Sequence, residues 1–415
     1  MTVLTIDIET TVRNVEGIAS YVVGDDKASP FHPENKAVLI GYLIGGTLTS
    51  GDGEDEYPYD VECFGEDSPD SAIYRFLAAL NRATVLVGQN IRFDMHYLHQ
   101  TFPQWESMWL HNPEHKIWDT QLAEYLLTAQ QHKYASLDEL AAKYGGTLKD
   151  DKIKAYWEAG VQTEDIPHEE LAEYLKADVE NTYLVYTKQL ELAEMTGMLP
   201  LIESQMRALV ATWEMAKNGM CFDYWRAVEQ ADILAKEIEA VQASIQPYVD
   251  QQHGEAPAGS FSITSNDVLS RLLFGGSYAY FVQEPTGEVF KTGSRKGQEK
   301  TKKTEKTSRV RGLFPPRKEW ETKKAGTYMV GDEVVKSLMG TGDSEAAKVL
   351  LDAVQSLRAL TKDRNTYFVG FSQLAWPQPD GSYRIHGKLN HTSTDTGRLS
   401  SSSPNCQNLS NKERD

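Results

Sequence analysis

The sequence has few cysteines, no long apolar run and, in its first half, few basic residues. Its three cysteines, Cys63, Cys221 and Cys406, are too scattered for a disulfide framework or a metal-binding spacing, which predicts a reduced, cytoplasmic protein. No apolar run approaches the ~18 residues that a membrane-spanning helix requires, and the first residues lack the basic region of a signal peptide. We therefore expect neither secretion nor a membrane partner.

The charge is unevenly distributed along the 415 residues, whose net charge is −18. Residues 1–190 contain 14 Lys and Arg against 32 Asp and Glu, a balance of −18, and residues 191–415 contain 28 of each kind. All the excess acid therefore lies in the N-terminal part. An acidic domain can still bind nucleic acid when divalent cations and a local basic surface offset the phosphates, so the net charge excludes no such function.

The pattern of apolar residues predicts two kinds of structure in a chain long enough for two or three domains. The first 190 residues alternate short apolar runs with helical spacing, which predicts an α/β domain with a mixed sheet. Strands are predicted at Val3–Ile8, Val38–Ile44 and Val85–Gly88, and helices at Pro69–Asn81, Phe93–Phe102, Leu122–Leu127, Leu137–Tyr144 and His168–Glu194. After Pro200 long helices are predicted at Ile202–Ala216, Trp225–Tyr248, Asn266–Phe274 and Ser344–Arg364.

A strongly basic segment interrupts this helical part. Residues 291–324 contain 13 Lys and Arg against four Glu, a local balance of +9, with few aliphatic residues and several Gly, Pro and Thr. This composition predicts an extended basic loop. Such a loop is either simply solvated or neutralises nucleic-acid phosphates, and Lys302 and Lys303 at its centre are the candidate DNA contacts.

Acidic residues lie at the ends of three predicted elements. Asp7 and Glu9 are two positions apart on the first strand, so their side chains point to the same side, and a divalent cation commonly stabilises such a pair. Asp94 falls in the first turn of a helix, and Tyr174 and Asp178 share one face of another. Each group alone also has an ordinary explanation: a solvated strand edge, a carboxylate that complements a helix dipole, or a polar helix surface.

The order and spacing of the four acids resemble a known group of nucleases. D-x-E at Asp7, N-x-x-F-D ending at Asp94 and Y-x-x-x-D ending at Asp178 are similar to the three motifs of the DEDDy 3′–5′ exonucleases, the proofreading domains of DNA polymerases. The resemblance implies a ribonuclease H-like fold and hydrolysis of phosphodiesters with two divalent cations. Mg²⁺ or Mn²⁺ is expected, because these cations prefer oxygen ligands.

The same resemblance implies a role for each residue. Asp7 would bridge both cations, Glu9 and Asp178 would hold the cation on the nucleophile's side, and Asp94 would hold the second cation directly or through water. Tyr174 would orient the attacking water, since a hydroxyl with a pKa of about 10 is a poor general base at neutral pH. Asn90 is either a turn residue or a support of the site, and we expect its neighbour Phe93 to pack the helix rather than touch substrate.

A second motif lies close to the end of the sequence. The stretch T-D-T-G-R-L-S-S-S-S-P-N-C-Q-N, from Thr394 to Asn408, closely resembles the first conserved stretch of family A DNA polymerases, which include bacterial DNA polymerase I and many phage replicases. The resemblance implies that Arg398, Gln407 and Asn408 contact the primer–template duplex. Cys406 departs from it, because the family usually has an aliphatic residue there.

Together the resemblances divide the chain into three parts: a 3′–5′ exonuclease domain at 1–195, a helical thumb at 196–383 with the basic loop at 291–324, and the start of a polymerase palm at 384–415. The palm carboxylates and the fingers helix of the family have no counterpart in the sequence. We therefore expect exonuclease activity, and nucleotide incorporation only if a second polypeptide supplies palm and fingers, unless the sequence is the N-terminal piece of a longer polymerase. A phage-type polymerase is expected, acting in the host cytoplasm on primer–template DNA and its single-stranded 3′ end.

Two other interpretations stay open at this point. The first is a stand-alone DEDD exonuclease that degrades RNA and carries an accessory C-terminal half. The stretch Gly397-Arg398-Leu399-Ser400 argues against it. The second is a catalytically idle subunit that clamps DNA and merely retains the acids. Nuclease assays on matched DNA and RNA strands would separate all three.

Overall fold

The computed structural model describes residues 2–12, 28–45, 47–50, 53–56, 61–147, 152–253, 256–341 and 344–409. The chain forms two compact units, one made of Met1–Tyr224 with Gln373–Asp415 and the other of Trp225–Ser372. The second unit is therefore inserted into the sequence of the first.

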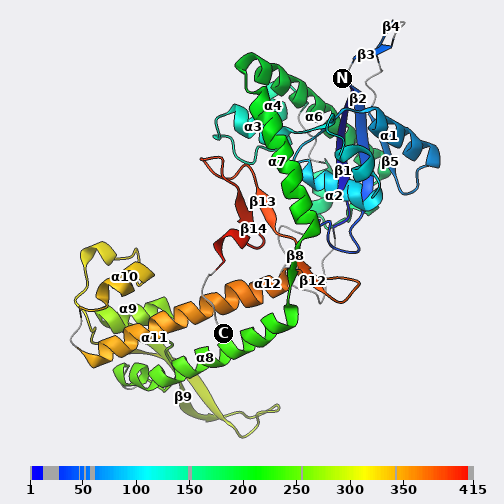
Figure 1. The fold of residues 1–415 in the computed structure, drawn as a ribbon. Helices are drawn as coiled ribbons and strands as arrows, with labels where there is room; N and C mark the ends of the chain where they lie inside the picture. Colours follow the sequence, from blue (N-terminus) through cyan, green and yellow to red (C-terminus); the bar gives the residue numbers. More distant parts are fainter. Residues whose placement is uncertain are drawn as a thin grey trace. The chain divides into compact units, whose positions relative to one another are not determined.

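A mixed sheet forms the centre of the first unit (Figure 1). It has five strands in the order β5-β2-β1-β6-β7. Its strands are β1 (Val3–Thr10), β2 (Ala37–Gly45), β5 (Glu62–Gly65), β6 (Val85–Gly88) and β7 (Lys116–Asp119). β2 is antiparallel to both β1 and β5, whereas β1, β6 and β7 run parallel. The predicted α/β domain with a mixed sheet is confirmed.

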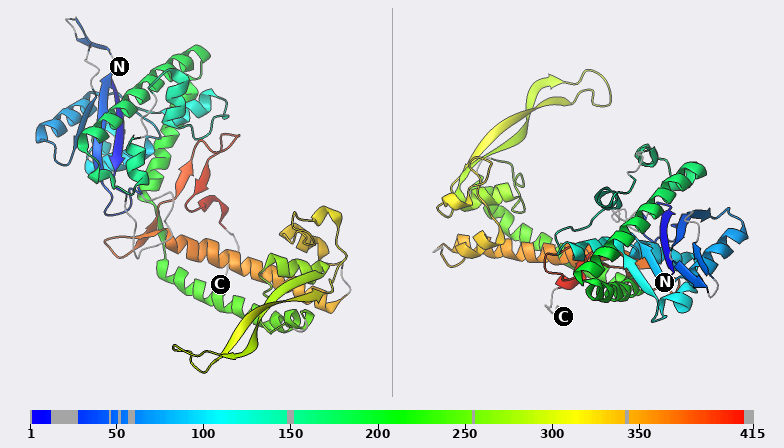
Figure 2. Two further views of the ribbon diagram at one scale, coloured as in Figure 1. Left: turned by 180° about the vertical axis from the view of Figure 1, so that it is seen from behind. Right: turned by 90° about the horizontal axis from the view of Figure 1, so that it is seen from above.

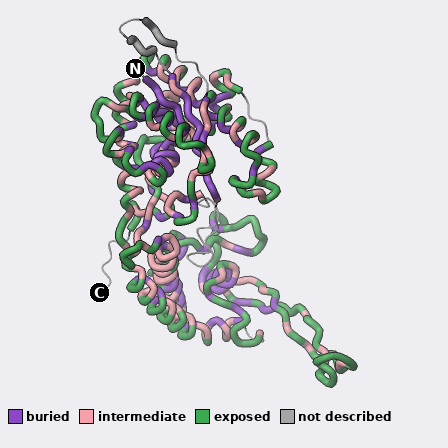
Figure 3. Tube along the Cα trace, turned by 90° about the vertical axis from the view of Figure 1, so that its right-hand side faces the viewer, coloured by how far each residue is buried: buried purple, intermediate pink, exposed green. Residues whose placement is uncertain are grey.

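Helices cover both faces of this sheet. Because neighbouring residues of a strand point to opposite faces, Gly41 of β2 faces α6 (His168–Thr196), while Tyr42 faces α1 (Asp70–Arg82), where its ring lies 5.2 Å from that of Phe76. Figure 3 shows the buried residues concentrated along these strands. The remaining helices of this part are α2 (Arg92–Thr101), α3 (Thr120–Leu127), α4 (Leu137–Tyr144) and α5 (Lys152–Glu158), with a π-helical turn at Glu106–Leu110 and a 3₁₀ turn at Thr163–Asp165.

Segments beyond residue 195 complete the first unit. Helix α7 (Leu199–Asn218) buries Trp213 in the same core as the sheet. β8 (Met220–Phe222) then pairs with β12 (Tyr383–Ile385), and β12 pairs with β11 (Ala375–Pro377). A hairpin of β13 (Lys388–Asn390) and β14 (Ser400–Ser402) follows, then a 3₁₀ turn at Cys406–Asn408. The backbone of β3 (Thr47–Ser50) and β4 (Gly53–Glu56) forms a separate hairpin.

The second unit combines helices with a long antiparallel ribbon. Its helices are α8 (Tyr224–Gln252), α9 (Asn266–Phe274), α10 (Asp332–Leu338) and α11 (Glu345–Lys362), followed by a π-helical stretch at Asp363–Val369 and the short α12 (Gly370–Gln373). The ribbon pairs β9 (Gly276–Val289) with β10 (Glu299–Val310), and a 3₁₀ turn lies at Lys318–Trp320. Figure 2 shows the ribbon projecting from the helices of its own unit.

The structure corrects the expectation for the basic segment. Part of the predicted basic loop at 291–324 is strand β10, because residues 301–310 pair one by one with strand β9, in which Tyr278 and Tyr280 favour extended structure. The compact units divide the chain elsewhere than at 195/196: α7 packs on the core of the sheet through Trp213, and the second unit begins at Trp225. None of the helices within the described ranges is both long and apolar enough to cross a membrane.

Candidate active site

Three of the predicted carboxylates meet at one point. Asp7 and Glu9 project from β1 and Asp178 from α6, and one carboxylate oxygen from each lies within 4.8 Å of the others. Asp178 is buried, while Asp7 and Glu9 are half-buried. Three anions this close repel one another unless protons or cations offset their charge. All the donors are hard carboxylate oxygens, so the set fits Mg²⁺ or Mn²⁺.

A glycine in β2 allows α6 to approach this point. Gly41 is the ladder partner of Asp7, and a Cβ at Gly41 would lie 2.7 Å from the Leu175 Cγ and 3.1 Å from the Val179 Cγ2. Leu175 and Val179 are fully buried against the sheet. Because Asp178 lies on the same stretch of α6, this close packing brings its carboxylate to the side chains of β1.

The fourth predicted carboxylate, Asp94, adjoins this group from the first turn of α2, although its oxygens are not within the 4.8 Å set. Asp94 is 2% exposed. Burial raises the pKa of Asp94 well above its ordinary value, the negative charge of Asp7 raises this pKa further, and a backbone hydrogen bond from Ile8 opposes the shift. A bound cation would reverse this preference and favour the carboxylate form.

Asp119 fixes the turn that presents Asp94. Its buried carboxylate accepts hydrogen bonds from the Ile91 N–H at 3.1 Å and from the Leu122 N–H at 3.0 Å, so it joins the start of α2 to the start of α3. Asn90, just before this turn, has φ = +52°, a left-handed conformation that Asn tolerates better than most residues. Asn90 is thus a turn residue, one of its two predicted roles.

Tyr174 lies one helical turn before Asp178, as predicted, and is half-buried. The ring of Trp157 from α5 stands perpendicular to the Tyr174 ring, with 5.9 Å between centroids. The Trp157 indole N–H donates to the Thr163 Oγ1 at 3.2 Å, which fixes the orientation of the indole.

A cavity of about 530 Å³ opens beside Glu9. Phe93 and Trp157 form aromatic parts of its lining, and Thr163 and Gln162 are among its polar parts. Trp157 is 37% exposed, so its indole is accessible from this space. Phe93 packs against the core and against the Tyr97 ring, with 5.1 Å between centroids, and it also lines the cavity next to Glu9.

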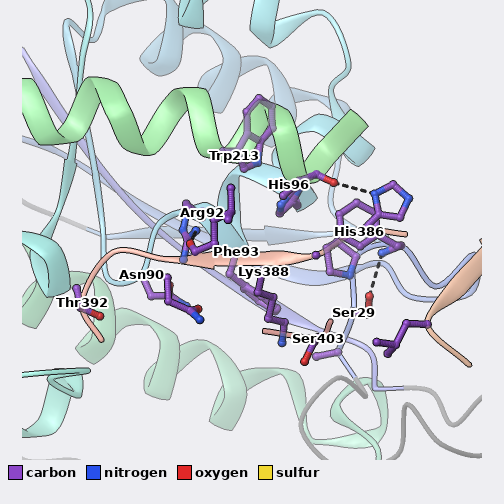
Figure 4. A pocket seen from close by; sticks show the side chains of 18 of the residues that line it. Ser29, Asn90, Arg92, Phe93, His96, Trp213, His386, Lys388, Thr392 and Ser403 are labelled. Atoms are coloured by element: carbon purple, nitrogen blue, oxygen red, sulfur yellow. Dashed lines mark hydrogen bonds between the residues drawn. The ribbon is translucent and has the colours of Figure 1, made fainter. Parts of the chain in front are cut away.

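A second cavity, of about 400 Å³, shares Ala28 and Phe93 with the first. Figure 4 shows Arg92, Phe93 and His386 among the side chains gathered around it. Arg92 and Lys388 contribute positive charge to its lining. Burial lowers the pKa of His96 to about 3, so this imidazole is neutral at physiological pH. The lining therefore combines two cations with aromatic and neutral polar groups.

Several hydrogen bonds join the C-terminal segment to the exonuclease part within the first unit. The Arg92 guanidinium donates to the Leu389 carbonyl, and the Tyr125 hydroxyl donates to the Thr394 carbonyl at 2.5 Å. The His391 Nε2 lies 2.7 Å from the Thr212 Oγ1. The His386 ring stacks on Phe31 with 3.8 Å between centroids.

The predicted DNA-contacting residues belong to other structural elements than the carboxylates. Arg398 is exposed in the loop between β13 and β14, where its carbonyl accepts a hydrogen bond from the Thr394 Oγ1 at 2.9 Å. Gln407 and Asn408 are exposed in the 3₁₀ turn that follows β14. Lys302 and Lys303 are exposed on β10 of the second unit.

Sequence reasoning missed Trp157, Arg92 and Asp119. Asp119 carries a sequence signal, because an acid directly before a helix commonly caps it. Arg92 lies inside the quoted N-x-x-F-D motif, but its partner Leu389 is almost 300 residues away, and no local pattern reports such a contact.

Comparison with known proteins agrees with both motifs. The family model described as 3′-5′ exonuclease matches residues 49–193, and the one described as DNA polymerase family A matches residues 286–415. The first match includes Asp94, Tyr174 and Asp178 and begins after Asp7 and Glu9, whose place in the site therefore rests on geometry.

Similar proteins include DNA polymerase I of Synechocystis sp., 26% identical over 301 residues, which are 71% of this chain and 24% of that polymerase. DNA polymerase I of Bacillus subtilis is 23% identical over 74% of this chain and 28% of its own length. A thermostable DNA polymerase I of Thermus thermophilus is 36% identical over 89 residues, covering 21% of this chain and 10% of the relative.

A solved structure shares the fold. The polymerase domain of Pol1 from M. smegmatis, in complex with DNA primer-template and dNTP, has a TM-score of 0.58 and 17% identity over 91% of this chain and 50% of that one. The chain spans 28% or less of the length of these curated relatives. Residues 49–193 therefore correspond to a 3′–5′ exonuclease domain and residues 286–415 to part of a family A DNA polymerase, in agreement with relatives that are DNA polymerases I.

Proposed function

We propose that this chain removes nucleotides one at a time from the 3′ end of DNA by two-metal-ion hydrolysis. The observation that carries this proposal is the convergence of Asp7, Glu9 and Asp178 within 4.8 Å, with the buried Asp94 beside them. Such a cluster is costly to a fold unless cations bind it.

The donor set suggests how the cations would be held. Asp7 would bridge both, Glu9 and Asp178 would hold one, and Asp94 would hold the other directly or through water. When bound, the two cations would supply a hydroxide near neutral pH and stabilise the charge on the leaving oxygen. Mg²⁺ is the expected ion, and Mn²⁺ is the expected substitute.

Tyr174 would orient the water that attacks the phosphorus, through its hydroxyl, without removing the proton itself. The packing of its ring against Trp157 supports this role, because a ring held by its neighbour loses little freedom when it positions water. Phe93 and Trp157 would contact the bases of the terminal nucleotides, since aromatic faces bind bases with little sequence preference.

The second cavity extends the proposed path of the strand. Arg92 and Lys388 lie in its lining, and cations there would bind the phosphates upstream of the terminal nucleotide. Because Ala28 and Phe93 line both cavities, a strand could follow them from one to the other.

Arg398, Gln407 and Asn408 are proposed contacts to the primer–template duplex. Their exposure on the hairpin and the following turn supports this role. Nucleotide incorporation is proposed to require palm and fingers groups that residues 1–415 do not supply, for example from a second polypeptide. Lys302 and Lys303 stay candidate phosphate contacts, and they point to opposite sides of β10.

A nuclease assay on labelled strands tests the proposal. A 5′-labelled single-stranded DNA with Mg²⁺ should give a ladder of products shortened one nucleotide at a time, and EDTA should abolish it. A matched RNA strand should be degraded more slowly. Faster degradation of RNA would favour an RNA exonuclease, and no degradation of either strand would contradict the proposal.

A further inference from the structure

The β9–β10 ribbon has two chemically different faces. The register pairs Thr301 with Pro285 and continues without interruption to the pairing of Arg309 with Ser277. Odd-numbered residues of both strands therefore point to one side and even-numbered residues to the other. We call the odd-numbered residues 277–285 and 301–309 the outer face. Every residue of the outer face is exposed.

The even-numbered side of the ribbon is attached to the core of its unit. Tyr280, Ser308 and Val310 are buried there, and Tyr278 and Val282 pack against the same cluster. The Ser308 hydroxyl donates to the His253 carbonyl at 2.7 Å. This side anchors the base of the ribbon, so the outer face is the side available to a partner.

Ion pairing distinguishes the two sides further, because the ion pairs of the ribbon within the described ranges lie on the even-numbered side. On the even-numbered side, Lys306 pairs with Glu284 at 2.8 Å, and near the tip Lys300 pairs with Glu288 at 2.9 Å. Lys303 and Arg309 of the outer face form no ion pair with any carboxylate in the described ranges. The outer face contains a single acid, Glu305.

The loop at the tip of the ribbon is also basic. Residues 290–298 contain three cations, Lys291, Arg295 and Lys296, and no acid. Two backbone hydrogen bonds of 2.9 Å between Phe290 and the pair Gly297 and Gln298 close this loop. The three cations therefore extend the positive charge of the outer face beyond the paired strands.

An aromatic residue supports one of the outer cations. Phe281 is 55% exposed at the middle of the outer face, and the Lys303 ammonium lies 4.2 Å from the centre of its ring. A cation–π contact of this kind orients the lysine without neutralising it. Small residues such as Ser277, Ala279 and Thr307 surround this pair and leave room for a close partner.

We propose that the outer face and the tip loop of the ribbon bind the phosphate backbone of duplex DNA. The proposal rests on the proposed function, because it assigns the ribbon to the same DNA that the exonuclease would process. A strand of 14 residues at ~3.3 Å per residue is roughly 45 Å long, which exceeds one turn of B-DNA, about 34 Å. A paired ribbon with fixed spacing suits a stiff double helix better than a flexible single strand.

The same charge argues against two other occupants. A second copy of the ribbon would bring like charges together, which is unfavourable. An acidic protein could complement the face, but the surface lacks the apolar cluster that such interfaces use as their centre, since Phe281 is the one large apolar side chain of the outer face and Phe290 that of the tip loop. The regularly spaced phosphates of DNA can bind these cations without an apolar centre in the interface.

Fluorescence anisotropy with a labelled duplex of about 30 base pairs, in EDTA, tests the proposal, because no hydrolysis is needed. The double variant Lys303→Gln/Arg309→Gln should weaken binding about tenfold and reduce the slope of log Kd against log salt by about two, since each phosphate contact contributes roughly 0.9. The matched control Lys336→Gln/Lys348→Gln removes the same charge from exposed positions of α10 and α11 and should change Kd less than twofold.

Two further variants make the test specific to the outer face. Lys302→Gln removes a cation from the opposite side of β10 and should weaken binding less than Lys303→Gln does. Replacing residues 286–300 by Asn-Gly removes the tip and keeps the buried base, and should weaken duplex binding further without changing the melting temperature by more than a few degrees.

The outcomes separate this inference from the proposed nuclease. Wild-type duplex affinity in the Lys303/Arg309 variant, or an equal loss in the α10/α11 control, would overturn the inference and leave nuclease activity unaffected. Loss of nuclease activity in every preparation, with ribbon-dependent duplex binding in EDTA, would overturn the proposed nuclease while the ribbon's role stands.

Discussion

Gly41 of β2 sets how closely Leu175 of α6 approaches the sheet: a Cβ on Gly41 would lie only 2.7 Å from the Leu175 Cγ. Gly41 is also the ladder partner of Asp7. The packing of one helix on one glycine therefore sets the distance between Asp7 on the sheet and Asp178 on the helix.

The first prediction concerns this contact. Gly41→Ala should displace α6, lower nuclease activity at least ~10-fold and cost about 1–3 kcal/mol of unfolding free energy, as overpacking commonly does. Leu175→Ala creates the missing space, so Gly41→Ala should cost much less unfolding free energy in the Leu175→Ala background than in the wild type. Urea unfolding and initial rates of the four proteins form a double-mutant cycle, and strictly additive effects would show that the two positions do not interact.

The second prediction concerns the carboxylates. Asp7→Ala or Asp178→Ala should reduce Mg²⁺-dependent hydrolysis of single-stranded DNA at least ~10²-fold, because a displaced cation removes several kcal/mol of transition-state stabilisation. Glu173→Gln removes a charge from an exposed position of the same helix and should retain the wild-type rate. Isothermal titration with Mn²⁺ should show the loss of binding directly, and full activity in either alanine variant would disprove the assignment.

The third prediction distinguishes positioning from proton transfer at Tyr174. Tyr174→Phe keeps the ring against Trp157 and removes the hydroxyl, so we expect a roughly tenfold lower kcat, a nearly unchanged KM and an unchanged shape of the pH–rate profile. If Tyr174 were the general base, the variant would lose ~10²–10⁴-fold, and its profile would change shape near the tyrosine pKa. Rates measured from pH 6 to pH 10 decide between the two roles.

The fourth prediction concerns acid stability and Glu124, whose side chain is fully buried. Its carboxylate accepts hydrogen bonds from Lys143 at 2.6 Å and from the Tyr144 hydroxyl at 2.8 Å. Burial alone would raise the pKa of Glu124, but these two hydrogen bonds, together with the positive charge of Lys143 and a hydrogen bond from Gln189, outweigh burial and lower this pKa below its ordinary value. The ionised form is therefore more stable in the folded protein than in the unfolded chain.

Because the pKa of Glu124 is lower in the folded protein than the unfolded value of about 4.3, its ionisation stabilises the fold at pH values above about 4.3. This contribution disappears as the pH falls through the folded-state pKa. Glu124→Gln should thus lose about 1–3 kcal/mol near pH 7, with the difference from wild type constant down to about pH 5 and shrinking below about pH 4. Urea unfolding at a series of pH values measures this difference. A gap that stays constant to pH 3 would contradict the assigned shift.

Local patterns in the sequence predict much of this structure. The predicted helices Leu137–Tyr144 and Asn266–Phe274 have the observed bounds, and the first begins with a capping box between Ser136 and Glu139. The carboxylates were identifiable because spacing of two on a strand and four on a helix fixes their direction. These predictions depend on residues close together in the sequence.

Features that depend on distant residues were not predictable in the same way. Considered alone, the sequence of β10 resembles a charged loop. In the structure it pairs with β9, and Tyr278 and Tyr280 of β9 pack in the core of the second unit. The bond between Arg92 and the Leu389 carbonyl, and the burial of Trp213 of α7 in the core of the sheet, likewise depend on tertiary packing. For this reason the predicted boundary at 195/196 did not coincide with the observed units.

The pairing of β8 with β12 also has a consequence for biosynthesis. Met220–Phe222 leaves the ribosome before residues 225–372, and its partner Tyr383–Ile385 follows only after them. At ~5–20 residues per second this interval lasts roughly 10–30 s, long enough for the inserted unit to fold first. A folded insert would spare the nascent chain the entropy of closing a long flexible loop, so the first unit would be completed last although its first 224 residues are translated first.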